Sequence, residues 1–140
     1  MQISDNGLVH HLESDEGVRY SVYRDSQGNL TEGVGHLVKQ GEHFPAVMTS
    51  QQVNDLLRKD LVGFEAAINS HVKVKLTQNQ YDSLVCFAFN IGIGGFLGST
   101  TLRKLNLGDY AGAAQAMLLW NLPPEIKGRR IKDMNLFLTP

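Results

Sequence analysis

The chain has 140 residues, of which 42% are hydrophobic and 19% are charged, so we expect a single globular domain with a sizeable core. Thirteen basic and fourteen acidic residues nearly cancel, which argues against a partner selected by overall charge, such as nucleic acid or an acidic membrane. Cys86 is the only cysteine, which excludes an intrachain disulfide, and its apolar neighbours predict a buried thiol.

The first residues are polar rather than a basic-then-apolar leader, so no signal peptide is expected. No apolar run approaches the roughly 20 residues that cross a bilayer, so no membrane insertion is expected either. If the substrate lies outside the cytoplasm, the protein must be delivered there by other means.

The first third of the chain predicts a helix followed by a small sheet. Residues 2–15 indicate a short helix, although Gly7 weakens the pattern, with apolar residues roughly on one side at Ile3, Leu8, Val9 and Leu12. Over residues 18–38, apolar and polar residues alternate loosely on either side of a turn at 25–29. This pattern predicts an antiparallel sheet. Gly33 and Gly35 face one side of their strand, which leaves room for a ligand.

From Thr49 onward the pattern is helical. Thr49 with Gln52 and Thr77 with Gln80 are capping boxes, and each predicts the start of a helix. The second helix is apolar nearly all round, so it should be central and buried. We expect glycines 92, 94 and 95 to end it.

Three further helices are expected. Ser99 or Thr100 starts a short one that Gly108 breaks, and Asp109 caps the next. The Pro pair at 123–124 predicts an extended link before a last helix over about 125–138. Its basic residues fit a solvated face as well as a functional role: Lys127, Arg129, Arg130 and Lys132. The whole chain, 1–140, is interpreted as one domain, with a β lobe at about 18–40 and a helical lobe at about 50–140 plus the N-terminal helix.

Two carboxylates and a hydroxyl stand around the predicted sheet. Glu16, Asp25 and Thr31 are the groups that hydrolysis of a glycosidic bond requires, namely two carboxylates and a group that holds water. Partial burial at the joint between the lobes would raise the pKa of Glu16 for use as a general acid. Asp25 as a turn residue and Thr31 as a strand residue are ordinary alternatives, and Glu13 and Asp15 are competing carboxylates.

The run from Glu16 to His36 keeps the spacing E-G-x-R…Y-x-D…G…T-x-G-x-G-H. In this run the chain resembles the phage-type lysozymes, the T4-lysozyme-like endolysins. A second block over 76–106 resembles the family's central helix and the residues after it, and the Arg129-Arg130 pair resembles its last helix. The resemblance spans nearly the whole chain.

This resemblance implies a lysozyme-like α+β fold, predominantly helical, with a cleft between the two lobes. It implies a muramidase that cleaves peptidoglycan between N-acetylmuramic acid and N-acetylglucosamine, without a cofactor or metal. Glu16 would be the general acid, while Asp25 and Thr31 would supply stabilising charge and position the water. The family usually inverts the anomeric centre, which needs carboxyl groups roughly 6.5–9.5 Å apart. His36, which lacks a second ligand at useful spacing, is expected to be structural.

Further site residues follow from the same resemblance. Leu37 matches a cleft-lining position, and three residues of the helical lobe are expected to line the sugar groove: Asn90, Phe96 and Ser99. Arg129 or Arg130 would pair with Glu16 and tune its pKa. Glu32 stands where the family has an aliphatic residue; in a regular strand it points away from Thr31 and Gly33.

Two other functions stay open at this point. A non-catalytic domain of the same fold would bind wall glycan without cutting it. A secreted antibacterial toxin would have the same activity and an immunity protein as partner. In the leading interpretation the protein is a monomer made in the cytoplasm that reaches the periplasm or cell wall through a holin or a secretion system, and peptidoglycan strands are its partner.

Overall fold

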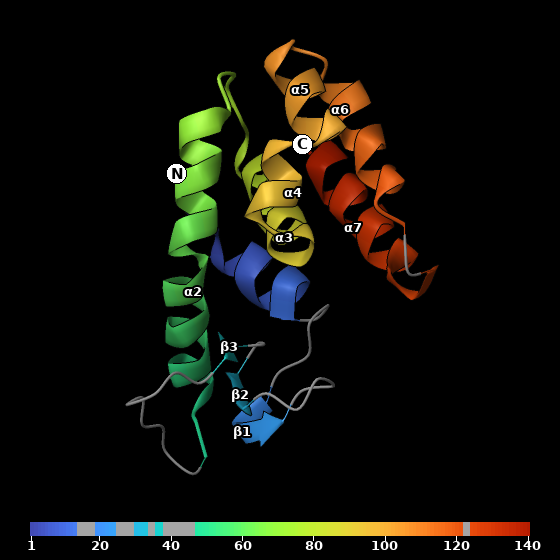
Figure 1. Ribbon diagram of the computed structural model, residues 1–140. Coiled ribbons are helices and arrows are strands. Elements are labelled where there is room, and N and C mark those ends of the chain that lie inside the picture. Colours follow the sequence, from blue (N-terminus) through green and yellow to red (C-terminus); the bar gives the residue numbers. More distant parts are fainter. Residues whose placement is uncertain (14–18, 25–29, 34–35, 38–46, 122–123) are drawn as a thin grey trace.

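The computed structural model describes residues 1–13, 19–24, 30–33, 36–37, 47–121 and 124–140 (Figure 1). Its elements in chain order are η1 (Asn6–Glu13), β1 (Arg19–Arg24), β2 (Leu30–Gly33), β3 (His36–Leu37), α2 (Ser50–His71), α3 (Gln78–Ile91), α4 (Ile93–Leu97), α5 (Thr100–Asn106), α6 (Tyr110–Ala116), η2 (Met117–Leu119), η3 (Pro124–Ile126) and α7 (Lys127–Leu138). The described part is therefore predominantly helical, as the sequence predicts.

The three strands form one antiparallel sheet in the order β1-β2-β3. Thr31 is the backbone partner of Tyr23 on β1 and of Leu37 on β3, while Glu32 pairs with His36. Strands β2 and β3 contact α2, which connects the sheet to the helices. That the sheet forms a separate lobe across a cleft stays a prediction.

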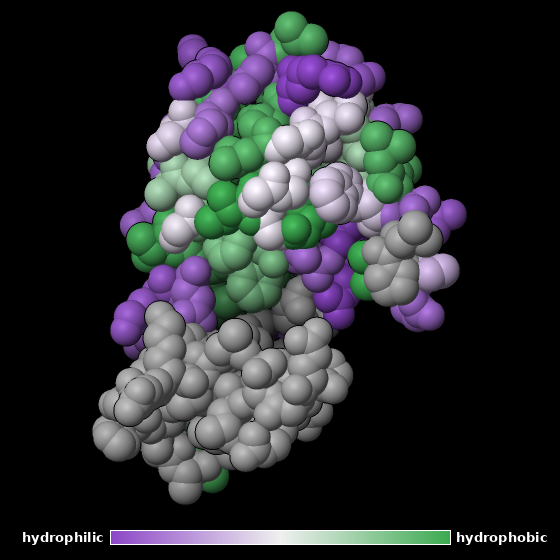
Figure 2. All heavy atoms as spheres, in the orientation of Figure 1, coloured by the Kyte–Doolittle hydropathy of each residue, from purple (hydrophilic) through white to green (hydrophobic). Residues whose placement is uncertain are grey.

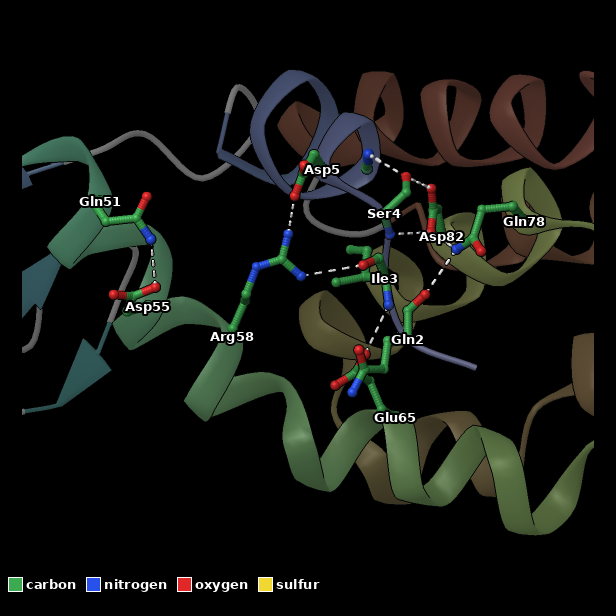
Figure 3. A network of polar contacts seen from close by, with 11 residues as sticks. Gln2, Ile3, Ser4, Asp5, Gln51, Asp55, Arg58, Glu65, Gln78 and Asp82 are labelled. Atoms are coloured by element: carbon green, nitrogen blue, oxygen red, sulfur yellow. Dashed lines mark hydrogen bonds and ion pairs between the residues drawn. The ribbon is translucent and has the colours of Figure 1, made fainter.

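The N-terminal helix begins at Asn6 rather than at the predicted residue 2 and is wound as a π-helix, η1, whereas its predicted end at 15 lies outside the described residues. The preceding residues lie between α2 and α3 (Figure 3), where the Ile3 amide donates to Glu65 at 2.8 Å and the Ser4 amide donates to Asp82 at 2.9 Å. The Ser4 hydroxyl accepts from the Gly7 amide at 3.1 Å. These bonds satisfy the backbone before Asn6, so Ile3 is buried without being helical.

The two long helices begin as the capping boxes predict. Thr49 and Thr77 each accept a hydrogen bond from the backbone three residues on, and Gln52 and Gln80 return the second bond of each box. Helix α3 is central, and its residues 81–88 are all buried, including the free thiol of Cys86. It contacts η1, α2, α4 and α7.

The chain after α3 corrects one expectation about glycines. Gly92 ends α3 with a φ of 90°, but Gly94 and Gly95 belong to the short helix α4. One residue in this conformation is enough to turn the chain, after which helical bonds resume. Ser99 caps α5, Gly108 follows it with a φ of 83°, and Asp109 caps α6, as predicted.

The link before the last helix is also different from the prediction. Pro124 opens the 3-10 helix η3, which runs directly into α7, whereas Pro123 lies outside the described residues. Proline fits a first helical turn because its missing N–H has no partner there in any case. The extended link therefore does not include Pro124.

The surface of the helical part mixes hydrophobic and hydrophilic residues on the face that Figure 2 shows. Leu107 and Leu119 are the most exposed leucines among the described residues, at 78% and 67%. Scattered exposed leucines are normal on globular proteins. None of the described helices is long and apolar enough to cross a membrane.

Candidate active site

Only one of the three predicted catalytic residues, Thr31, lies within the part of the chain that the structure describes. Glu16 and Asp25 lie outside the described residues, so the separation of their carboxyl groups stays a prediction. Thr31 and Leu37 are direct backbone partners on β2 and β3. Glu32 pairs with His36 on β3, but the pairing of β1 with β2 is irregular between Arg19 and Tyr23, which is the stretch opposite Gly33 to Thr31 and so includes the position of Glu32. The direction of the Glu32 side chain therefore stays a prediction.

Helix η1 leads the chain towards Glu16 and ends at Glu13. Burial raises the pKa of the Glu13 carboxyl above its usual 4.5. The side-chain amide of Asn54 on α2 is oriented with its nitrogen towards this carboxyl group, and that nitrogen donates to Glu13 Oε2 at 2.6 Å. Sequence reasoning treats Glu13 only as a competitor of Glu16. A raised carboxyl pKa thus lies three residues before the predicted acid.

Arg130 is fully buried, which contradicts a solvated face for the whole basic cluster. Its Nε donates to the Trp120 carbonyl at 2.9 Å, its Nη1 donates to Asp133 at 3.1 Å, and its Nη2 donates to Asn90 Oδ1. Its guanidinium carbon also lies 5.7 Å from the centroid of the Phe87 ring. Lys127 and Lys132, in contrast, are exposed.

Asp133 extends this network to the N-terminal helix. Its Oδ1 accepts from His11 Nε2 at 2.9 Å, and its main-chain oxygen accepts from the Ser83 hydroxyl at 2.5 Å. Sequence reasoning missed His11 and Asp133, because 122 positions separate them and no local pattern links them. The helical spacing of Arg130, Asp133 and Phe137, which places all three on one face of α7, was the only signal available.

The three residues of the helical part that were predicted to line the sugar groove differ in burial. Phe96 is fully buried, and the Ser99 hydroxyl accepts from the Leu102 amide at 3.1 Å and donates to the Phe96 carbonyl at 2.7 Å. These roles inside the helical part argue against direct sugar contact by Phe96 and Ser99. Asn90 is half-buried on the last turn of α3, so its side chain reaches the surface.

The described residues contain no group of three His, Cys, Asp or Glu side chains arranged to hold a metal ion. What they do contain is a neutralised pair of buried charges, with hydrogen bonds to η1 and α3. Such an arrangement holds side chains in fixed positions and is structural rather than catalytic.

Comparison with known proteins gives consistent matches along the chain. The phage lysozyme family matches residues 13–135. An endolysin of Salmonella phage P22 is 44% identical over 146 residues, which covers 99% of both chains.

Two solved structures have the same fold. A crystal structure of a P22 lysozyme mutant superposes with a TM-score of 0.91 at 43% identity and covers 99% of both chains. The muramidase domain of SpmX from Asticaccaulis excentricus superposes with a TM-score of 0.85 at 39% identity, again covering 99% of both chains.

Proposed function

The chain belongs to the phage lysozyme family and is a peptidoglycan-lysing muramidase, and we propose that Glu16, Asp25 and Thr31 carry out its reaction. The observation that carries this proposal is the match to a phage endolysin over 99% of both chains. The bond cut is the β-1,4 link from N-acetylmuramic acid to N-acetylglucosamine.

Glu16 protonates the leaving oxygen as general acid. Asp25 supplies negative charge beside the developing oxocarbenium ion, and the Thr31 hydroxyl holds the attacking water. A water between carboxylate and sugar requires carboxyl groups roughly 6.5–9.5 Å apart and leads to inversion. The place of Thr31 in the middle strand of the sheet supports its role, since strands position a side chain more rigidly than loops.

The substrate lies in a cleft between the sheet and the helices, within a single domain. Residues 14–18 connect η1 to β1, so an acid at Glu16 stands where the two parts join. On the sheet side Leu37 lines the cleft next to Thr31, and on the helical side Asn90 faces the sugar. The contacts of α2 with β2 and β3 support this arrangement.

Arg130 is the weaker of the two arginine candidates to pair with Glu16, because its guanidinium donates hydrogen bonds to Trp120, Asp133 and Asn90. Arg129 lies half-buried on the same first turn of α7. A positive charge there lowers the pKa of Glu16, whereas burial raises it, and the balance sets the pH range of the enzyme.

The enzyme acts on the bacterial cell wall during phage lysis, in keeping with its endolysin relatives. It is made in the cytoplasm and is delivered to the wall. A non-catalytic glycan-binding role would leave the three reactive groups unused.

Clearance of a cell-wall suspension tests the proposal. Glu16→Gln keeps the shape of the side chain but removes the proton donor, so the rate should fall about 100- to 10,000-fold. Glu13→Gln, a matched change three residues earlier, should clear walls at close to the normal rate. If the Glu16 variant clears walls as fast as the unmodified protein, the assignment of the acid is wrong. If the unmodified protein binds walls without clearing them, the non-catalytic alternative is correct.

A further inference from the structure

The buried charges of α7 form a chain of contacts across the helical part. Arg130 Nη1 lies 3.1 Å from Asp133 Oδ2, and His11 Nε2 lies 2.9 Å from Asp133 Oδ1. At the other end Arg130 donates to Asn90. One continuous path therefore runs from η1 through α7 to the last turn of α3.

The path is deeply buried except at Asn90, which is half-buried. The side chains of Arg130 and Asp133 are 0% and 2% exposed, and that of His11 is 9% exposed. Removing such groups from water costs several kcal/mol per ion, which the mutual attraction and the hydrogen bonds must offset. Apolar residues of similar volume often give equal or greater stability. A gain in stability is thus a weak explanation for these buried polar side chains. A stronger explanation is that their hydrogen bonds fix the relative positions of η1, α3 and α7.

The two ends of the path lie at functionally important places. His11 stands two residues before the end of η1, and the proposed acid Glu16 follows it five positions later in the sequence. Asn90 is the residue that we place on the sugar side of α3. Asp133 stands between these ends, and the Ser83 hydroxyl holds its main chain.

We infer that His11 and Asp133 are positioning residues of the muramidase: their contact fixes η1, the helix that precedes the proposed acid Glu16 in the sequence, relative to α7 and Asn90. Neither residue touches the substrate. The inference rests on the proposed role of Glu16, and it adds two residues that act through the acid.

Two amides of different length test the contact. His11→Gln places its amide nitrogen where Nε2 stood and can still donate to Asp133. His11→Asn is one methylene shorter and cannot reach. We expect the Asn variant to lose about 10- to 100-fold in kcat with little change in KM, because misplacing an acid slows the chemical step. The Gln variant should retain most of the activity.

Thr101→Val is the control for a purely structural effect. The buried Thr101 hydroxyl donates to the Ala113 carbonyl at 3.1 Å, within the α5–α6 pair and away from the path. Its loss should lower the melting temperature but leave kcat unchanged when assays are run well below that temperature. Equal kcat values for His11→Asn and Thr101→Val would overturn the inference. So would a rise in KM alone, or failure of both His11 variants to fold.

Glu16→Gln, assayed in parallel, separates this inference from the proposed function. If Glu16→Gln is inactive and His11→Asn is fully active, only the positioning role is wrong. If Glu16→Gln is fully active, the proposed function fails first.

Discussion

Glu13 shows how burial alters a single ionisable side chain. It is half-buried at the end of η1, and the loss of surrounding water disfavours its charged form, so its pKa is raised. The folded protein therefore holds this proton more tightly than the unfolded chain does. The contribution of Glu13 to stability is fully present below the ordinary pKa of 4.5 and is lost as the pH rises through the raised value.

Glu13→Gln removes this titration. We expect the melting temperature of the variant, relative to the unmodified protein, to increase as the pH rises from about 4 to about 7, because only the unmodified protein must then bury a charge. Thermal melts of both proteins at several pH values measure the difference. A difference that is constant with pH would show that the pKa of Glu13 is not shifted by folding, and a difference that shrinks would show that folding lowers it; either result contradicts the prediction.

Arg130 shows that residue type alone does not decide exposure. It stands in a basic stretch with Lys127 and Lys132, yet it is the largest fully buried side chain among the described residues. A planar guanidinium with five donors satisfies several acceptors at once, which an ammonium group does not do. Burial of this particular cation is therefore compatible with a carbonyl, a carboxylate and an amide as partners.

At the scale of elements, the helix boundaries follow from local chemistry. Each capping box joins residues three positions apart, and the Ser99 and Asp109 caps do the same. Gly92 supplies the backbone conformation that separates α3 from α4, with φ 90° and ψ 156°. Residues with a Cβ rarely adopt that region.

Gly92→Ala should therefore destabilise the protein by about 1–3 kcal/mol. The cost is one of backbone conformation, since nothing lies within 4 Å of the position that a Cβ would occupy. Gly94→Ala is the control: its surroundings are equally open, and it lies inside α4 without a positive φ. Urea unfolding measures both. The prediction is wrong if the two variants lose equal stability.

At the scale of the whole molecule, α3 organises the packing of the elements around it (Figure 1). Asp82 of this helix accepts hydrogen bonds from the Ser4 amide and hydroxyl and from Gln78 (Figure 3). This arrangement brings η1 so close that a Cβ on Gly7 would lie 2.7 Å from Asp82 Cγ. Gly7 is thus a point of close approach between two elements.

Alanine at Gly7 tests this approach. In an open helix Gly→Ala stabilises by roughly 0.5–1 kcal/mol, but here we expect a loss of about 1–3 kcal/mol because η1 must move away from α3. Gly128→Ala in α7 is the matched control, since no atom lies within 4 Å of its added Cβ, and it should stabilise the protein. Calorimetry gives both values. Stabilisation by both substitutions would exclude the close contact.

Much of the helical fold was predictable because its signals are local. The capping boxes, the buried pattern of α3 and the glycine after α5 each depend on residues a few positions apart. The winding of η1 and the helical state of Gly94 and Gly95 were not predictable. They depend on how Ser4, Asp82 and Gly92 satisfy the backbone around them.

The candidate site divides in the same way. The motif that contains Glu16, Asp25 and Thr31 could be recognised in the sequence alone as resembling the phage-type lysozymes, and the match of that family to residues 13–135 agrees with it. The burial of Arg130 and its link through Asp133 to His11 depended on tertiary packing. Helices far apart in sequence meet there, and a charge is retained in the core only where partners from several helices converge.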